Sequence, residues 1–247
     1  MSPAVVSSLP ASAMLSSQTL ARLRNHTWTG MRLMVIGFLL FWVPYIYYVG
    51  ALLLLAGVVF LWFGRRAFAD SHRRWVARGT VLLFLGLIGL LAVEVLFDLG
   101  LSSLTSQSGL SAAAALAALQ QDLDFFVIGT FAFTVICALG FVALPYGRAD
   151  GLSRGILWAG FGAAFVLGVV EFSTFWSEFT GVITNAQMGI VNTAPLANVQ
   201  GQLLWFEIFS VVPYVLFAWG YLRVRSRLFP GGKNAARASI YRDLGAG

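Results

Sequence analysis

The basic residues of this chain fall into separate groups, and long apolar segments lie between them. The 16 Lys and Arg residues occupy positions 22–32, 65–78, 148–154 and 223–242. The far end of each apolar segment carries no Lys or Arg, so every basic residue can lie on one side of a membrane. Short loops rich in Lys and Arg remain in the cytoplasm. The pattern therefore predicts how often the chain crosses a membrane and in which direction.

The composition favours a membrane protein over a soluble domain. Of the 247 residues, 59% are hydrophobic and 11% are charged, whereas a soluble domain has roughly 25% charged residues. One globular core cannot cover so many apolar side chains, so we expect lipid to be the second solvent. The net charge of +6 follows from the topology rule, and we expect no nucleic-acid partner. Cys137 is the only cysteine, which excludes an internal disulfide.

The first apolar segment, 33–63, is too long for one helix across a hydrocarbon core of roughly 30 Å. A single long helix would place Arg32 and Arg65 on opposite sides of the membrane. A tight hairpin near Pro44 keeps both on the inside, and we favour it for that reason. Four further crossings are expected at 80–97, 125–145, 155–176 and 203–222.

These crossings predict an all-α integral membrane protein, a six-helix transmembrane bundle with both termini in the cytoplasm and a multi-pass location in the cell membrane. We expect a cytoplasmic tail over 1–26, the transmembrane domain over 27–225 and a basic cytoplasmic tail over 226–247. Ser111 is the expected N-cap of a helix that extends the fourth crossing outward, and Ser153 the expected N-cap of the fifth.

Acidic residues show the opposite asymmetry, because most of them lie in the outer half of the predicted bundle. Glu94 and Asp98 share one face of the third helix, and Glu171 and Glu178 share one face of the fifth. Glu207 begins the sixth helix at a similar depth. Carboxylates in lipid cost several kcal/mol unless they are paired, protonated or hydrated.

Two interpretations of these carboxylates stay open. In the first, Glu94, Glu171 and Glu207 form an outward-facing cation or proton site with Asp98 and Glu178 at its mouth. Such oxygen ligands suit Ca²⁺, Mg²⁺ or H⁺ better than zinc or copper, although the sequence does not identify a metal. In the second, they are carboxylates at the membrane interface and bind no ligand.

Two other surfaces are predicted to contact lipid or other helices. The basic face is expected to bind lipid headgroups, through Arg73, Arg74, Arg223 and Arg225. The fifth helix carries small residues four apart, which let another backbone approach closely. They serve either packing within the chain or a homo-oligomer or partner-subunit face, and they are Gly155, Ala159, Ala163, Gly160, Ala164 and Gly168.

The sequence contains no pattern that predicts catalysis or a cofactor. It has no His-Glu-x-x-His, no phosphate-binding glycine loop and no dinucleotide fingerprint. We therefore expect no enzyme and no cofactor. The first hypothesis is an accessory or scaffold protein, or a subunit of a membrane complex. The alternative is a small transporter or channel that uses the outer carboxylates, and a membrane enzyme that acts on lipid or glycan is the third hypothesis.

The apolar hairpin is followed by Gly64-Arg65-Arg66-Ala67-Phe68 and then by Gly- and Leu-rich crossings. This pattern, over 50–89, resembles uncharacterised archaeal multi-pass membrane protein families. Those families have no established activity, so the resemblance implies a membrane fold and no particular function.

Overall fold

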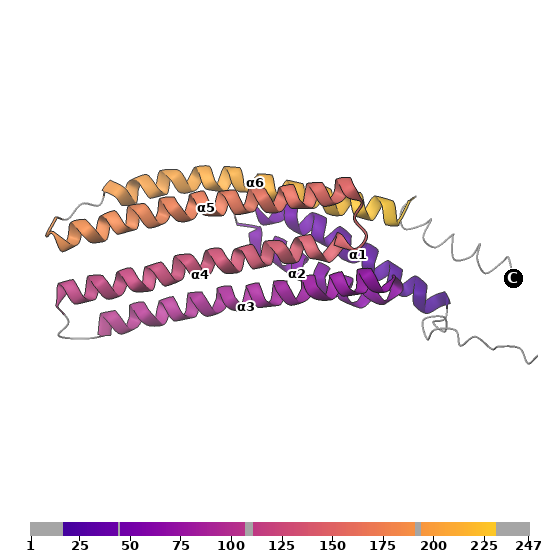
Figure 1. The fold of residues 1–247 in the computed structure, drawn as a ribbon, viewed down its shortest axis with the longest axis horizontal. Helices are drawn as coiled ribbons and strands as arrows, with labels where there is room; N and C mark the ends of the chain where they lie inside the picture. Colours follow the sequence, from indigo (N-terminus) through magenta and orange to yellow (C-terminus); the bar gives the residue numbers. More distant parts are fainter. Residues whose placement is uncertain (1–16, 44, 107–110, 191–193, 231–247) are drawn as a thin grey trace, which may run out of the picture.

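A computed structural model of the chain describes residues 17–43, 45–106, 111–190 and 194–230. Within these ranges the chain consists of helices and the turns that connect them, and it has no strand. Figure 1 shows long helices that run side by side. A short 3-10 helix, η2, lies between the second and third helices in the chain. The elements are α1 (Ser17–Phe41), α2 (Tyr47–Gly64), η2 (Arg65–Ala67), α3 (Asp70–Ser106), α4 (Ala112–Tyr146), α5 (Gly151–Gln187) and α6 (Ala194–Leu228).

The first apolar segment folds as the predicted hairpin. α1 ends at Phe41, α2 begins at Tyr47, and the two helices pack against each other. Glycine permits their close approach, because a Cβ at Gly50 would lie 2.6 Å from the Phe41 backbone nitrogen. Tyr45 turns the chain between them with a φ of 68°, a left-handed conformation that is uncommon for any residue but glycine.

α3 and α4 form a second hairpin, and α5 and α6 form a third. Ser111 caps α4 as predicted, since its hydroxyl oxygen accepts a hydrogen bond from the Ala114 N–H at 3.3 Å. The helices are longer than the predicted crossings. α3 and α5 each have 37 residues, which corresponds to about 55 Å at 1.5 Å per residue. They therefore exceed a hydrocarbon core of roughly 30 Å.

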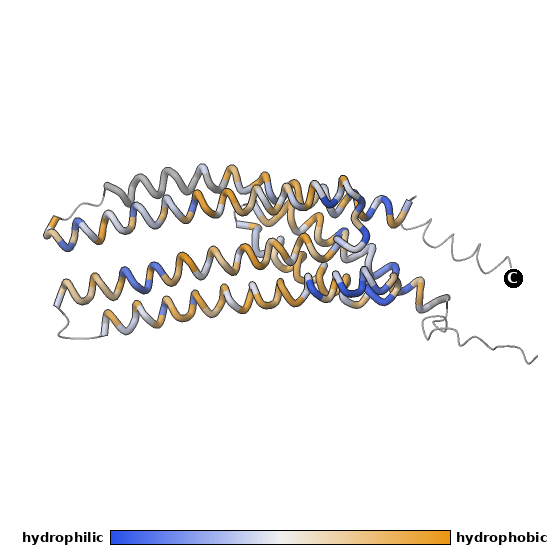
Figure 2. Tube along the Cα trace, viewed as in Figure 1, coloured by the Kyte–Doolittle hydropathy of each residue, from blue (hydrophilic) through white to orange (hydrophobic). Residues whose placement is uncertain are grey.

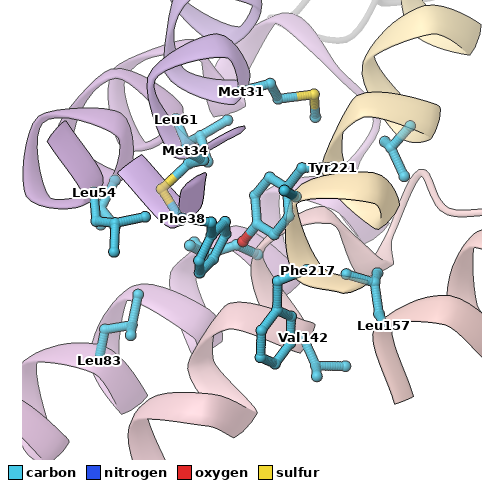
Figure 3. Packing of buried hydrophobic residues seen from close by; sticks show 14 of the residues in the cluster. Met31, Met34, Phe38, Leu54, Leu61, Leu83, Val142, Leu157, Phe217 and Tyr221 are labelled. Atoms are coloured by element: carbon cyan, nitrogen blue, oxygen red, sulfur yellow. The ribbon is translucent and has the colours of Figure 1, made fainter. Parts of the chain in front are cut away.

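Two apolar cores hold the hairpins together. The larger core joins all six helices near the basic end, where Phe38 and Tyr221 lie at its centre, both fully buried (Figure 3). α1 packs against α6, so the first and last helices close this part of the bundle. The smaller core is built around Leu123, Val127 and Ile183 and binds the distal parts of α3, α4 and α5 to one another.

Four helices are long and apolar enough to cross a membrane: α2 with η2, and α3, α4 and α5. Figure 2 shows hydrophilic residues gathered at one end of the bundle and hydrophobic residues over most of its length. The hydrophilic end, which we call the basic end, holds the 65–78 and 148–154 segments and the C-terminal part of α6. The described chain is thus an all-helical protein of the membrane type, and the six crossings remain a prediction.

Candidate functional site

The described carboxylates of the predicted acidic site lie on α3 and α5, which are not direct packing partners. Glu94 and Asp98 are exposed on α3, Glu171 is exposed on α5, and Glu178 is half-buried on the same helix. α3 packs on α4, and α5 packs on α4 and α6. α4 therefore lies between the two carboxylate pairs, an order that can be followed in Figure 1. Glu207 belongs to α6, but its side chain lies outside the described part of the structure.

No group of three or more His, Cys, Asp and Glu side chains that could hold a metal ion occurs among the side chains that the structure describes, and that of Glu207 is not one of them. The periodicity that pairs Glu94 with Asp98, and Glu171 with Glu178, holds within each helix. The cation or proton site that would join the two pairs stays a prediction, and Glu207 would have to complete it.

Two carboxylates that the sequence did not assign to a site make contacts between helices. The Asp124 Oδ1 atom on α4 accepts a hydrogen bond from the indole nitrogen of Trp176 on α5, with a donor–acceptor distance of 2.6 Å. The Asp122 carboxylate packs against Gly100 of α3, where an added Cβ would lie 2.5 Å from its Oδ2 atom. Both contacts tie α4 to its neighbours in the half of the bundle away from the basic end.

At the basic end, Asp150 joins the start of α5 to the end of α6. Its Oδ1 atom accepts a hydrogen bond from the Ser153 N–H at 3.0 Å and another from the Ser153 hydroxyl. Its Oδ2 atom lies 2.8 Å from Arg227 and 3.8 Å from Arg223. The prediction that Ser153 caps α5 is wrong, because the N-cap is Asp150. A carboxylate accepts a hydrogen bond from the third helical N–H as well as a hydroxyl does, and it also pairs with cations.

These contacts lower the pKa of the Asp150 carboxyl below its ordinary value. The side-chain hydrogen bond with Ser153 contributes most, the backbone hydrogen bond follows, and Arg227 and Arg223 add to it. A lowered pKa means that the folded protein holds the charged form more strongly than the unfolded chain does. The resulting stabilisation is fully present above the ordinary aspartate pKa and is lost as pH falls through the lowered value.

We expect Asp150→Asn to lower the melting temperature in detergent at neutral pH by more than Asp70→Asn does. Asp70 makes one exposed ion pair, with Arg73 on its own helix at 3.1 Å, and such pairs contribute little. The difference between wild type and Asp150→Asn should persist down to the ordinary aspartate pKa and shrink below it. Melting curves from neutral to strongly acidic pH measure this, and equal effects of both substitutions at every pH would contradict it.

The four arginines predicted to bind lipid headgroups have different surroundings. Arg73 pairs with Asp70, and Arg223 lies near Asp150, so a carboxylate already faces each of them. Arg74 is exposed. Arg225 instead lies over the ring of Trp28 on α1, 5.7 Å from its centroid. The structure thus separates Arg225 from the paired arginines, and lipid binding by the four stays a prediction.

His72 is fully buried at the basic end, although it sits in a segment that the sequence placed at the surface. Its ring packs edge-on against Phe68 at 5.1 Å between centroids, and its backbone lies against Gly147. Neither ring nitrogen has a hydrogen-bond partner among the residues that the structure describes. The imidazole thus fills space between η2, α3 and the turn that follows α4.

The fold and the distribution of charge define the class: an all-helical protein of the membrane type, in which most of the described acidic residues lie away from the basic end. Comparison with known proteins adds no family to that class. No protein-family model, no curated protein and no solved structure matches this chain.

Proposed function

We propose that this protein crosses the cell membrane six times, with α1 and α6 completing the bundle and the basic end in the cytoplasm. We further propose that it acts as an accessory or scaffold protein, a subunit of a membrane complex, and not as an enzyme. The asymmetry of Lys and Arg supports the orientation. A strip of small residues on α5 that faces away from the bundle supports the assembly role.

That strip is the observation on which the proposal depends. A Cβ added at Gly155 or at Gly162 meets nothing within 4 Å, and Ala159 between them is exposed. On the other side of α5 the small residues are already used within the chain. A Cβ at Gly160 would lie 3.3 Å from Leu216, and one at Gly168 would lie 3.0 Å from Phe131. The exposed strip therefore offers α5 backbone to a further helix.

We expect Gly155→Leu and Gly162→Leu to abolish assembly while leaving the monomer folded. Leucine on this strip holds a partner backbone away, and it should reduce the associated form at least tenfold, or about 1.4 kcal/mol. Light scattering after purification in a mild detergent, together with crosslinking in native membranes, measures the associated fraction.

The matched control for this experiment is Gly181→Leu. Gly181 also belongs to α5, and an added Cβ there meets nothing within 4 Å. It lies roughly 28 Å along the helix from Gly162, at 1.5 Å per residue, so it is off the strip. Equal association of wild type and all three variants would refute the assembly surface.

The alternative is a small transporter or channel that uses Glu94, Asp98, Glu171, Glu178 and Glu207 for a cation or proton. It comes second because α4 separates the carboxylates of α3 from those of α5. The strip on α5, by comparison, is continuous and unoccupied within the described chain.

A further inference from the structure

Trp28 of α1 is in contact with two guanidinium groups from different helices. The Arg32 group, on the same helix, lies 5.6 Å from the ring centroid, and the Arg225 group, from α6, lies 5.7 Å from it. Within the described residues, every other aromatic ring in such a contact has a single arginine. Those pairs are Arg65 with Trp62, Arg78 with Trp75, Arg148 with Phe68, and Arg154 with Tyr146.

Two positive charges that converge on one ring repel each other unless an anion lies between them. Burial lowers the pKa of the Arg225 guanidinium, and the nearby charge of Arg32 lowers it further. Some other arginines at the basic end have a carboxylate, as Arg227 has Asp150 at 2.8 Å. Among the residues that the structure describes, neither Arg32 nor Arg225 forms an ion pair.

The packing of α1 against α6 fixes the backbone positions of Arg32 and Arg225. Met31 of α1 and Val224 of α6 are fully buried and belong to the larger core. Each of the two arginines follows one of these residues, so its backbone is held by the core. Arg32 is exposed and Arg225 is half-buried. Tryptophan commonly lies at the level of lipid headgroups, and the planar guanidinium group binds phosphate oxygens in pairs.

We propose that Arg32, Arg225 and Trp28 form a binding site for the phosphate of an anionic phospholipid at the seam between α1 and α6. The guanidinium groups donate hydrogen bonds to the phosphate oxygens, and each of them also contacts the indole ring. The negative charge of the headgroup turns the repulsion between the two arginines into attraction to a shared ligand. This site is independent of the strip on α5.

Native mass spectrometry of the full-length protein tests the proposal. The protein is released from detergent after incubation with phosphatidylglycerol, with phosphatidylcholine or with inorganic phosphate, and the bound adducts are counted. We expect retained phosphatidylglycerol on the wild type and at least tenfold less on R32Q and on R225Q. The double variant should lose no more than either single variant, because both arginines bind the same phosphate.

R78Q is the matched control. It removes one positive charge from the basic end and also removes a cation–π contact with a tryptophan, Trp75. It should retain phosphatidylglycerol as the wild type does. R225K keeps the positive charge but loses the planar guanidinium group, which can donate two hydrogen bonds to one phosphate. We therefore expect it to retain less phosphatidylglycerol than the wild type.

Three results would overturn the proposal. Equal loss in R78Q would mean that net charge alone attracts the lipid. Unchanged retention in R32Q and R225Q would mean that the lipid binds elsewhere. Equal binding of inorganic phosphate, or of phosphatidylcholine, would exclude an anionic lipid as the specific ligand.

Discussion

Gly79→Leu is expected to destabilise the bundle by about 3 kcal/mol or more, a cost at the upper end of overpacking in proteins. A Cβ at Gly79 of α3 would lie 2.8 Å from the Leu144 backbone nitrogen and 2.9 Å from the Gly140 carbonyl oxygen of α4. These are backbone atoms, which cannot turn away as the end of a flexible side chain can. A leucine there must therefore separate α3 from α4, and these two helices form one of the three hairpins.

Reversible unfolding of the purified protein in mixed micelles measures this loss. Gly181→Leu is the matched control, because the same substitution there meets open space. It should leave stability unchanged or slightly higher, since leucine is the better helix former. If both variants unfold at the same denaturant concentration, then α3 and α4 do not pack as closely as the structure shows.

Phe38→Ala is expected to cost about 3 kcal/mol of stability. The Phe38 ring is fully buried, and its centroid lies 5.0 Å from that of Phe141, 5.4 Å from that of Phe217 and 5.5 Å from that of Tyr221. In water-soluble cores Phe→Ala costs about 3–5 kcal/mol. Lipid dissolves an aromatic ring nearly as well as a protein core does. Most of the loss in stability therefore comes from the cavity and the lost ring contacts, and we expect it at the lower end of that range.

The control for Phe38→Ala is Phe63→Ala, on a residue that is 59% exposed. Its ring contacts little of the protein, so alanine there should change stability by less than about 1 kcal/mol. The same unfolding assay compares the two. Equal losses would mean that the larger core is not centred on Phe38.

The helical class and the first hairpin were predictable because each depends on a strong signal. Apolar length limits where helices cross, and Arg32 and Arg65 must share a side, which forces a turn between them. The Ser111 cap was also predictable, since a serine precedes an alanine-rich segment. These features are local, or they depend on the membrane and not on which helices are neighbours.

The distal extensions of α3 and α5 were not predictable in the same way. The outward extension of α4 was expected from Ser111, but no helix was predicted over 102–106 or 177–187, because these segments lie beyond one membrane thickness. The smaller core explains why α3, α4 and α5 continue there. Phe97, Phe126 and Phe179 pack around its buried residues from three helices, and sequence periodicity does not show which helices meet.

The candidate sites were predictable only as far as single helices. Spacing correctly placed Glu94 with Asp98 on one helix, but it did not show that α4 lies between them and Glu171. The approach of Arg225 to Trp28 and Arg32 could not be predicted, since it occurs only because α1 packs on α6. The burial of His72 likewise depends on a turn 75 residues later, at Gly147.

The contact between α1 and α6 also has a consequence for biosynthesis. Phe38 stacks on Phe217, so α1 cannot complete its packing until nearly the whole chain has been made. At roughly 5–20 residues per second, translation from one ring to the other takes about 10–35 seconds. During that interval the face of α1 that will pack on α6 is in contact with lipid or with helices of the insertion machinery. α1 completes its packing only when α6 has been made and packs against it.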